Sequence, residues 1–180
     1  MKYGSATLGQ TEAVINRMGG MDNWLRYAGG QGKVVFETIL TLLRTWKTPP
    51  QMSVTTSKEY FAKVGVKVTG TDFETQFYGL EVAATAVIEL AVRKLEEGSL
   101  DAPIMAELGD KAEIGVGQFR AFLAANRKSA EWFIFYLRGK DGNLWAVRAW
   151  RAGDDGWFVR ASSVDSPVRW IAGRQVVSRN

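Results

Sequence analysis

Three runs of aromatic and β-branched residues in the last fifty positions form the clearest hydrophobic pattern of the chain. The runs are 132–138 (WFIFYLR), 143–151 (NLWAVRAWR) and 156–162 (GWFVRAS). Runs of this composition predict β-strands when turn residues separate them. Asp141-Gly142 lies between the first two runs and is typical of a two-residue hairpin turn. Residues 152–155 separate the second run from the third. We therefore predict a C-terminal three-stranded antiparallel meander.

The turn lengths predict which residues share a face of this meander. A two-residue turn would place Arg138 opposite Trp145, and a four-residue second loop would place Trp150 opposite Trp157. The resulting apolar face, which we expect to be the core side, holds Phe133, Phe135, Leu137, Ala146, Arg148, Trp150, Trp157, Val159 and Ala161. The other face mixes aromatic residues with arginines and holds Trp132, Ile134, Tyr136, Arg138, Trp145, Val147, Ala149, Arg151, Phe158 and Arg160. A one-residue difference in the second loop would exchange the faces of the third strand.

Glycine pairs and apolar spacing indicate helices before residue 50. Two short helices are predicted in the first 32 residues, the first ending at Gly19–Gly20 and the second at Gly29–Gly30. The segment 34–46 has apolar residues near helical spacing, and we favour a helix there. Its β-branched residues also allow a strand, so both interpretations stay open.

Pro49–Pro50 is the strongest break in the pattern, because neither residue fits a helix interior and each restricts the residue before it. We take it as a boundary between a helical N-terminal region, 1–48, and an α+β body, 51–180. A single domain over 1–180 is the alternative.

The middle of the chain mixes strand and helix patterns. Valines alternate with other residues over 64–68 and predict a strand, and residues 85–94 alternate in the same way. A short helix is expected to begin near Thr71, and the apolar spacing over 116–125 predicts a second helix. The fold class is therefore α+β, with N-terminal short helices, a mixed middle, and the C-terminal meander packed on helices.

Composition narrows the chemistry, because the 180 residues include no Cys and no His. These absences exclude disulfides, thiol nucleophiles, Cys or His metal sites and Ser-His-Asp catalysis. The segment Gly29–Lys33 (GGQGK) lacks the spacing of a phosphate-binding loop. No pattern brings carboxylates together from distant segments. We predict no catalytic residue, no metal and no cofactor, and an enzyme would depend on Asp/Glu, Lys, Tyr or Arg chemistry.

The hydropathy pattern predicts a cytoplasmic protein. The first ten residues contain no apolar run typical of a secretion signal. The longest apolar stretch, 80–92, is interrupted by two glutamates and is too short to cross a bilayer. We expect no membrane association, and formation of a homo-oligomer stays open.

Arginine and tryptophan are concentrated near the C-terminus. Residues 118–180 carry eleven basic and five acidic side chains, whereas 71–117 carry three and ten. Five of the seven tryptophans and seven arginines follow residue 130. Arginine is the preferred bidentate partner of carboxylates and phosphates. The candidate binding residues are Trp132, Tyr136, Arg138, Trp145, Arg151, Arg160, Arg169, Trp170 and Arg174.

Exposed arginines and aromatic residues on one sheet face predict a non-catalytic binding module. The same residue types dominate protein interfaces and single-strand nucleic-acid platforms. We favour an unknown protein partner, with nucleic acid on the same face and the Arg-rich tail as the alternative. Helices covering this face would remove both hypotheses. A carboxylate-based enzyme is the third class.

Three stretches also carry a resemblance: LGQTEAVINRMGG at 8–20, LDAPIMAELG at 100–109, and LWAVRAWRAGDDGWFVRASSVDSPVRWIAGRQVVSRN at 144–180. With them the chain resembles a group of uncharacterised proteins from environmental bacterial genomes of the candidate-phyla type. The likeness is loose between 33 and 62. It implies a natural unit that recurs as a whole, and it implies no activity, cofactor or site residue.

Overall fold

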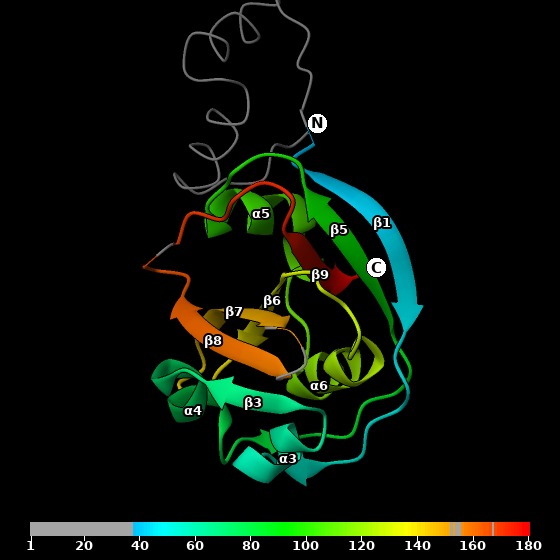
Figure 1. Ribbon diagram of the computed structural model, residues 1–180, viewed down its shortest axis with the longest axis vertical. Helices are drawn as coiled ribbons and strands as arrows, with labels where there is room; N and C mark the ends of the chain where they lie inside the picture. The colour runs from blue at the N-terminus through cyan, green and yellow to red at the C-terminus, as the bar shows by residue number, and fades with distance from the viewer. Residues whose placement is uncertain (1–37, 152, 154–155, 167) are drawn as a thin grey trace, which may run out of the picture.

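The computed structural model describes residues 38–151, 153, 156–166 and 168–180 (Figure 1). The two helices expected in the first 32 residues lie outside these ranges. Within them the chain forms strands and helices in the order β1 (Leu40–Lys47), β2 (Val54–Thr55), α3 (Lys58–Ala62), β3 (Val66–Thr69), α4 (Thr71–Phe77), β4 (Glu81–Val82), β5 (Glu89–Leu95), α5 (Asp101–Leu108), a 3-10 turn (Gly109–Lys111), α6 (Val116–Ala125), β6 (Phe133–Arg138), β7 (Leu144–Arg151), β8 (Trp157–Ser163) and β9 (Gln175–Arg179).

Seven of these strands form one mixed sheet in the order β1-β5-β9-β6-β7-β8-β3, and β2 pairs with β4 separately. Neighbouring strands of the large sheet are antiparallel except for β9 with β6 and β3 with β8, which are parallel. The α+β class predicted from the sequence is confirmed. The three C-terminal runs form β6, β7 and β8, which pair antiparallel in succession as part of this larger sheet.

The prediction of a helix over 34–46 is wrong for its described part, because Leu40–Lys47 is the edge strand β1. This strand pairs antiparallel with β5 from Leu40 opposite Leu95 to Lys47 opposite Glu89. Pairing with β5 satisfies the backbone groups of one side of β1, and the apolar spacing fits either structure. Tertiary pairing therefore overrides a local pattern that allowed both. The division of the chain at Pro49–Pro50 stays a prediction.

Two apolar cores pack against opposite faces of the sheet. Phe133, Phe135 and Leu137 of β6 join one core with residues of α3, α4 and α6. Ile134 and Tyr136 of the same strand join the other core, which includes residues of α5 and Trp170. Figure 1 shows α5 near β5 and β9, with α6 on the other side of β6 and β7 in this view. The central strand β6 is buried on both faces for this reason.

The predicted register of the first hairpin is wrong by one residue. Arg138 lies opposite Leu144, and not opposite Trp145. A two-residue type I′ turn needs positive φ at both central residues, but Asp141 has no positive φ, whereas Gly142 has φ +77°. The N–H of Gly139 donates to the carbonyl of Asn143 at 2.9 Å, which encloses a three-residue loop with Gly142 at its left-handed position. The extra loop residue moves every side chain of β7 to the other face.

The second loop is also one residue longer than expected. Arg151, and not Trp150, lies opposite Trp157, and Arg148 lies opposite Arg160. The two one-residue differences cancel for β8, so Trp157 and Val159 share a face with Phe133 as predicted. Only the side chains of β7 lie on the faces opposite to those predicted. Arg148 and Trp150 therefore join the face that carries Trp132 and Arg160, and Trp145 leaves it.

Candidate functional site

Three aromatic rings stack across β6, β7 and β8 on the face of the sheet that carries α5. We call Trp132, Trp150 and Phe158 the aromatic ladder. The ring centroids of Trp132 and Trp150 are 4.6 Å apart with an interplanar angle of 9°, and those of Trp150 and Phe158 are 5.6 Å apart at 28°. All three side chains are partly buried. The ladder follows from register, since Trp150 lies opposite Phe158 and Trp132 directly precedes β6.

Arg174 covers the outer end of the ladder. Its guanidinium carbon lies 3.9 Å from the ring centroid of Trp132. The parallel pairing of β9 with β6 brings these residues together, because the N–H of Gln175 donates to the carbonyl of Trp132 at 3.0 Å. Burial lowers the pKa of Arg174 from its ordinary value, and the charge of Glu131 acts in the opposite direction. At 3.9 Å a cation over an indole ring gives a favourable cation–π contact.

Arg148 and Arg160 lie beside the middle ring of the ladder. Their guanidinium carbons are 6.0 Å and 5.9 Å from the ring centroid of Trp150, and the two residues are directly opposite each other in the β7–β8 register. Burial lowers the pKa of Arg148, with the positive charge of Arg160 as the second cause. The Arg148 Nε is buried without a hydrogen-bond partner. Like charges directly opposite on a sheet repel each other.

The ladder arginines form no salt bridge within the described part of the chain, although the charge of Glu131 acts on Arg174. The residues that the structure describes form the salt bridges Arg138–Glu113 and Lys94–Glu96. Arg148, Arg160 and Arg174 take part in neither. Three positive charges therefore share one partly open surface with the ladder and have no carboxylate at salt-bridge distance. We call this set, Trp132, Trp150, Phe158, Arg148, Arg160 and Arg174, the arginine–aromatic face.

The stacking decides which part of each ring a ligand can reach. The two faces of the Trp150 ring are turned toward Trp132 and Phe158, and the Trp132 ring lies between Arg174 and Trp150. Ring edges are therefore presented to a ligand, together with guanidinium groups. The edge of an aromatic ring is its electropositive part. A surface of this kind attracts oxyanions, and it offers little room for a base to stack without separating the ladder.

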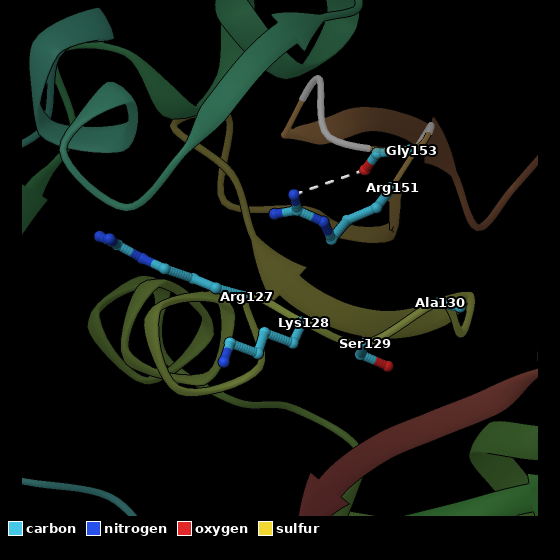
Figure 2. Close-up of a pocket in the computed structure, with 6 residues that line it drawn as sticks. All are labelled: Arg127, Lys128, Ser129, Ala130, Arg151 and Gly153. Atoms are coloured by element: carbon cyan, nitrogen blue, oxygen red, sulfur yellow. Dashed lines mark hydrogen bonds between the residues drawn. The ribbon is translucent and has the colours of Figure 1, made fainter.

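A basic hollow of about 480 Å³ lies at the end of β7 that carries Trp150 and Arg151. It is lined by Arg127, Lys128, Ser129, Ala130, Arg151 and Gly153. Figure 2 shows the side chains of Arg127 and Lys128 just after α6, with Arg151 across from them. Since side chains alternate along a strand, Arg151 and Trp150 point to opposite faces of the sheet.

Two of the three cations in this hollow have backbone partners. Arg127 donates to the carbonyl of Lys63 at 2.7 Å, and Arg151 donates to the carbonyl of Gly153 at 3.5 Å. These contacts engage both guanidiniums within the fold. The hollow is therefore a weaker candidate for anion binding than the arginine–aromatic face.

The structure brings together three of the nine residues predicted to bind, namely Trp132, Arg160 and Arg174. The Arg138 guanidinium is paired with Glu113 and also donates to the carbonyl of Gly142 at 2.7 Å. The Trp145 indole N–H donates to the Asp141 carboxylate, at 3.2 Å to the nearer oxygen. These two are engaged at the far end of the hairpin from the ladder.

The other predicted residues are engaged elsewhere. Arg169 donates to the carbonyl of Gly98 at 3.2 Å. Arg151 lines the hollow described above. Tyr136 and Trp170 are buried, with exposed fractions of 0% and 5%, so they do not contribute to an exposed surface.

Sequence reasoning missed Arg148 and Trp150 because the register error assigned both to the core side. Phe158 was placed on the correct face but was not selected. The signal that could have found them is the loop sequence Gly139-Lys140-Asp141-Gly142-Asn143. It fits a three-residue hairpin loop with glycine in the left-handed position as well as it fits a two-residue turn.

A buried carboxylate lies under α5 on the same face of the sheet. Asp101, the first residue of α5, has no exposed surface. Its Oδ1 accepts hydrogen bonds from the Tyr136 hydroxyl at 2.8 Å and from the Trp170 indole N–H at 2.7 Å. Burial raises the pKa of Asp101, and the two hydrogen bonds oppose that shift. Burial, with the charge of Asp101 as the second cause, raises the pKa of Tyr136.

Asp101 and its partners have the arrangement of a structural link. The carboxylate joins α5, β6 and the segment before β9 through neutral donors. Among the residues that the structure describes, no three His, Cys, Asp or Glu side chains are grouped so as to hold a metal ion. None of the described helices is long and apolar enough to cross a membrane.

Comparisons with family models, curated proteins and solved structures returned no match. The resemblance to candidate-phyla proteins is not tested by them and stays a prediction. The geometry of the arginine–aromatic face is therefore the basis for any functional assignment.

Proposed function

We propose that this protein is a non-catalytic binding module that holds an acidic segment of a protein partner on its arginine–aromatic face. The observation that carries the proposal is the group of three guanidiniums, Arg148, Arg160 and Arg174, on one partly open surface without a salt bridge in the described chain. Tryptophan and arginine are also the residue types that contribute most to protein interfaces.

The orientation of the rings supports a protein partner over single-stranded nucleic acid. Single-strand binding platforms stack bases on exposed ring faces. In the ladder, Trp132 and Trp150 turn their faces toward each other at 4.6 Å. Carboxylates can approach the ring edges and guanidiniums without separating the rings. Nucleic acid bound by the same face and the Arg-rich tail remains the alternative function.

The proposal is tested by fluorescence anisotropy with three labelled probes: a peptide of alternating Glu and Leu, the same peptide with Gln in place of Glu, and oligothymidine. We expect the Glu peptide to bind and the Gln peptide to bind at least about tenfold more weakly, because complementary charge specifies the partner. The triple variant R148Q/R160Q/R174Q should lose this difference, whereas R169Q should keep it. Arg169 is exposed and lies outside the face, which makes R169Q the matched control.

Two results would contradict the protein-partner function. Equal affinity for the Glu and Gln peptides would show that charge is not recognised. Preferred binding of oligothymidine, weakening steeply between about 50 and 200 mM salt as released counterions require, would favour the nucleic-acid alternative. A cytoplasmic location and the possibility of a homo-oligomer are carried into this proposal unchanged, and size-exclusion chromatography of the full chain tests the second.

A further inference from the structure

We infer that Arg148 and Arg160 form a single oxyanion subsite, which holds one carboxylate or phosphate group of a partner side chain. The inference rests on the proposed function for the origin of the ligand. It goes further in assigning one anionic group to one pair of residues. Arg174 then serves the ladder through its contact with Trp132 and lies outside the subsite.

Two like charges are placed next to each other in the subsite. Arg148 and Arg160 are directly opposite each other across β7 and β8, where Cβ atoms are about 4.5–5.5 Å apart. Neither has an anionic partner among the described residues. Both guanidinium carbons lie about 6 Å from the same ring centroid, that of Trp150. An oxyanion between the two guanidiniums would turn their repulsion into two attractive contacts.

Arg148 also has a buried donor. Its Nε is shielded from solvent and has no acceptor. A buried donor without a partner is uncommon in folded proteins and requires an explanation. The Nε and one terminal nitrogen of a guanidinium form a fork that matches the two oxygens of a carboxylate or phosphate. A turn of the Arg148 side chain that opens this nitrogen to a ligand oxygen would satisfy the donor, whereas a ligand without an oxyanion would leave it unpaired.

Arg160 is held in place from its other side. A Cβ atom added at Gly70 would lie 3.2 Å from the Cγ of Arg160, so the backbone that precedes α4 lies against the stem of this side chain. The stem is therefore supported, and the guanidinium is exposed next to Trp150. A supported arginine loses less conformational freedom when it binds, which favours recognition.

The test uses the full chain and small anions, so that it does not depend on the peptide partner. The Nε–Hε resonance of Arg148 is followed by nuclear magnetic resonance while phosphate, and separately acetate, replaces chloride at constant ionic strength. We expect a saturable shift of this resonance with either anion. The variant R160Q should weaken the apparent affinity about fivefold or more, and R169Q should leave it unchanged. The variant R148K keeps the charge but removes the fork, and it should also weaken binding.

The outcomes separate the subsite from the proposed function. No saturable shift at Arg148, or an equal shift in R160Q and the wild type, would overturn the subsite. Saturable anion binding without binding of the Glu peptide would contradict the proposed function and leave the subsite standing. Peptide binding that R148K and R160Q reduce no more than R169Q does would overturn the subsite alone. Replacing one Glu of the peptide with phosphoserine shows which oxyanion is preferred. Thermal unfolding of each variant verifies that it is folded.

Discussion

The face of β6 and β7 that carries α5 has two halves, and these differ in how their charged side chains are partnered. Under α5, the carboxylate of Asp101 is buried and accepts hydrogen bonds from two neutral donors, Tyr136 and Trp170. At the other half, Arg148, Arg160 and Arg174 are beside stacked rings and form no salt bridge among the residues described. One half thus holds a buried carboxylate that only neutral groups bind, and the other holds guanidiniums that no carboxylate pairs with directly.

The difference follows from access to water. A polar group that is sealed from water must find its hydrogen bonds inside the chain, because leaving it unpaired is costly. Asp101 meets this requirement at Oδ1, whereas its Oδ2 is buried without a hydrogen-bond partner. The arginines are only partly buried, so water or a ligand can satisfy most of their donors. We therefore expect the buried half to stabilise the fold, and the partly open half carries the proposed binding site. The predictions below test each half in turn.

The largest effect is expected from Asp101→Ala. The substitution leaves the Tyr136 hydroxyl and the Trp170 indole N–H buried without their acceptor. We expect the free energy of unfolding to fall by about 2–4 kcal/mol, since each unsatisfied buried donor costs about 1–3 kcal/mol. Urea unfolding followed by circular dichroism measures this loss. Asp110→Ala, at an exposed position, is the matched control, and an equal effect of both substitutions would refute the structural role.

A smaller loss is expected from Trp150→Ala, which removes the middle ring of the ladder. We expect the free energy of unfolding to fall by about 2 kcal/mol, less than for a fully buried Trp because this side chain is partly exposed. The far-ultraviolet circular dichroism band of the coupled Trp132 and Trp150 indoles should disappear. Trp145→Ala, on the same strand but the opposite face, should retain this band. Survival of the circular dichroism band in Trp150→Ala would contradict the stacking of Trp132 on Trp150.

The pH dependence of stability should distinguish Asp101 from exposed carboxylates. Burial raises the pKa of Asp101 in the folded state, so the folded protein binds a proton more tightly than the unfolded chain at this site. This contribution is greatest at acidic pH and is lost as pH rises above about 4, the ordinary pKa of aspartate, and through the raised pKa of the folded state, because stability falls with pH wherever the folded state holds more protons.

The comparison with Asp101→Asn isolates this contribution, since the variant has no titrating group at position 101. The free energy of unfolding of the wild type, minus that of the variant, should decrease as pH rises across this range. Denaturant titrations at several pH values measure the difference. A constant or rising difference would contradict a raised pKa.

The smallest effect is expected from Arg174→Gln, which removes the cation over the Trp132 ring at 3.9 Å. A partly exposed cation–π contact contributes about 0.5–1 kcal/mol, so the free energy of unfolding should fall by that amount. Arg169→Gln should change it less. If the two variants are equal within error, Arg174 makes no net contribution to the ladder. Both values come from the same urea titrations.

Local patterns predicted the elements that depend on short-range signals. The helix predicted at 116–125 is α6 at the same bounds, and the short helix expected near Thr71 is α4. Of the alternating valines, Val66 and Val68 lie in β3, and Val64 lies in the turn before it. The predictions failed where distant partners decide the structure: β1 became a strand by pairing with β5, and β9, which was not predicted, is inserted between β5 and β6.

The candidate site was predicted in composition but not in detail. The concentration of Arg and Trp after residue 130 is visible in the sequence, and Trp132, Arg160 and Arg174 do gather on one face. Trp150 and Arg148 were assigned to the other face because a two-residue turn was assumed at Asp141-Gly142. Tyr136 and Trp170 were expected at a surface, and α5 with its Asp101 buries them. The local pattern of residues 132–170 does not indicate that α5 covers Tyr136 and Trp170.

The sequence by itself determined the chemistry that this protein lacks, because no folding can supply an absent Cys or His. It also determined the class of the fold, since hydrophobic period is a local property. The tertiary structure decided which arginines have anionic partners and which rings stack. The physical reason is that one residue more or less in a loop decides to which face of the sheet a side chain points. Whether that side chain is then buried depends on an element that is distant in sequence. Function in this molecule depends on both.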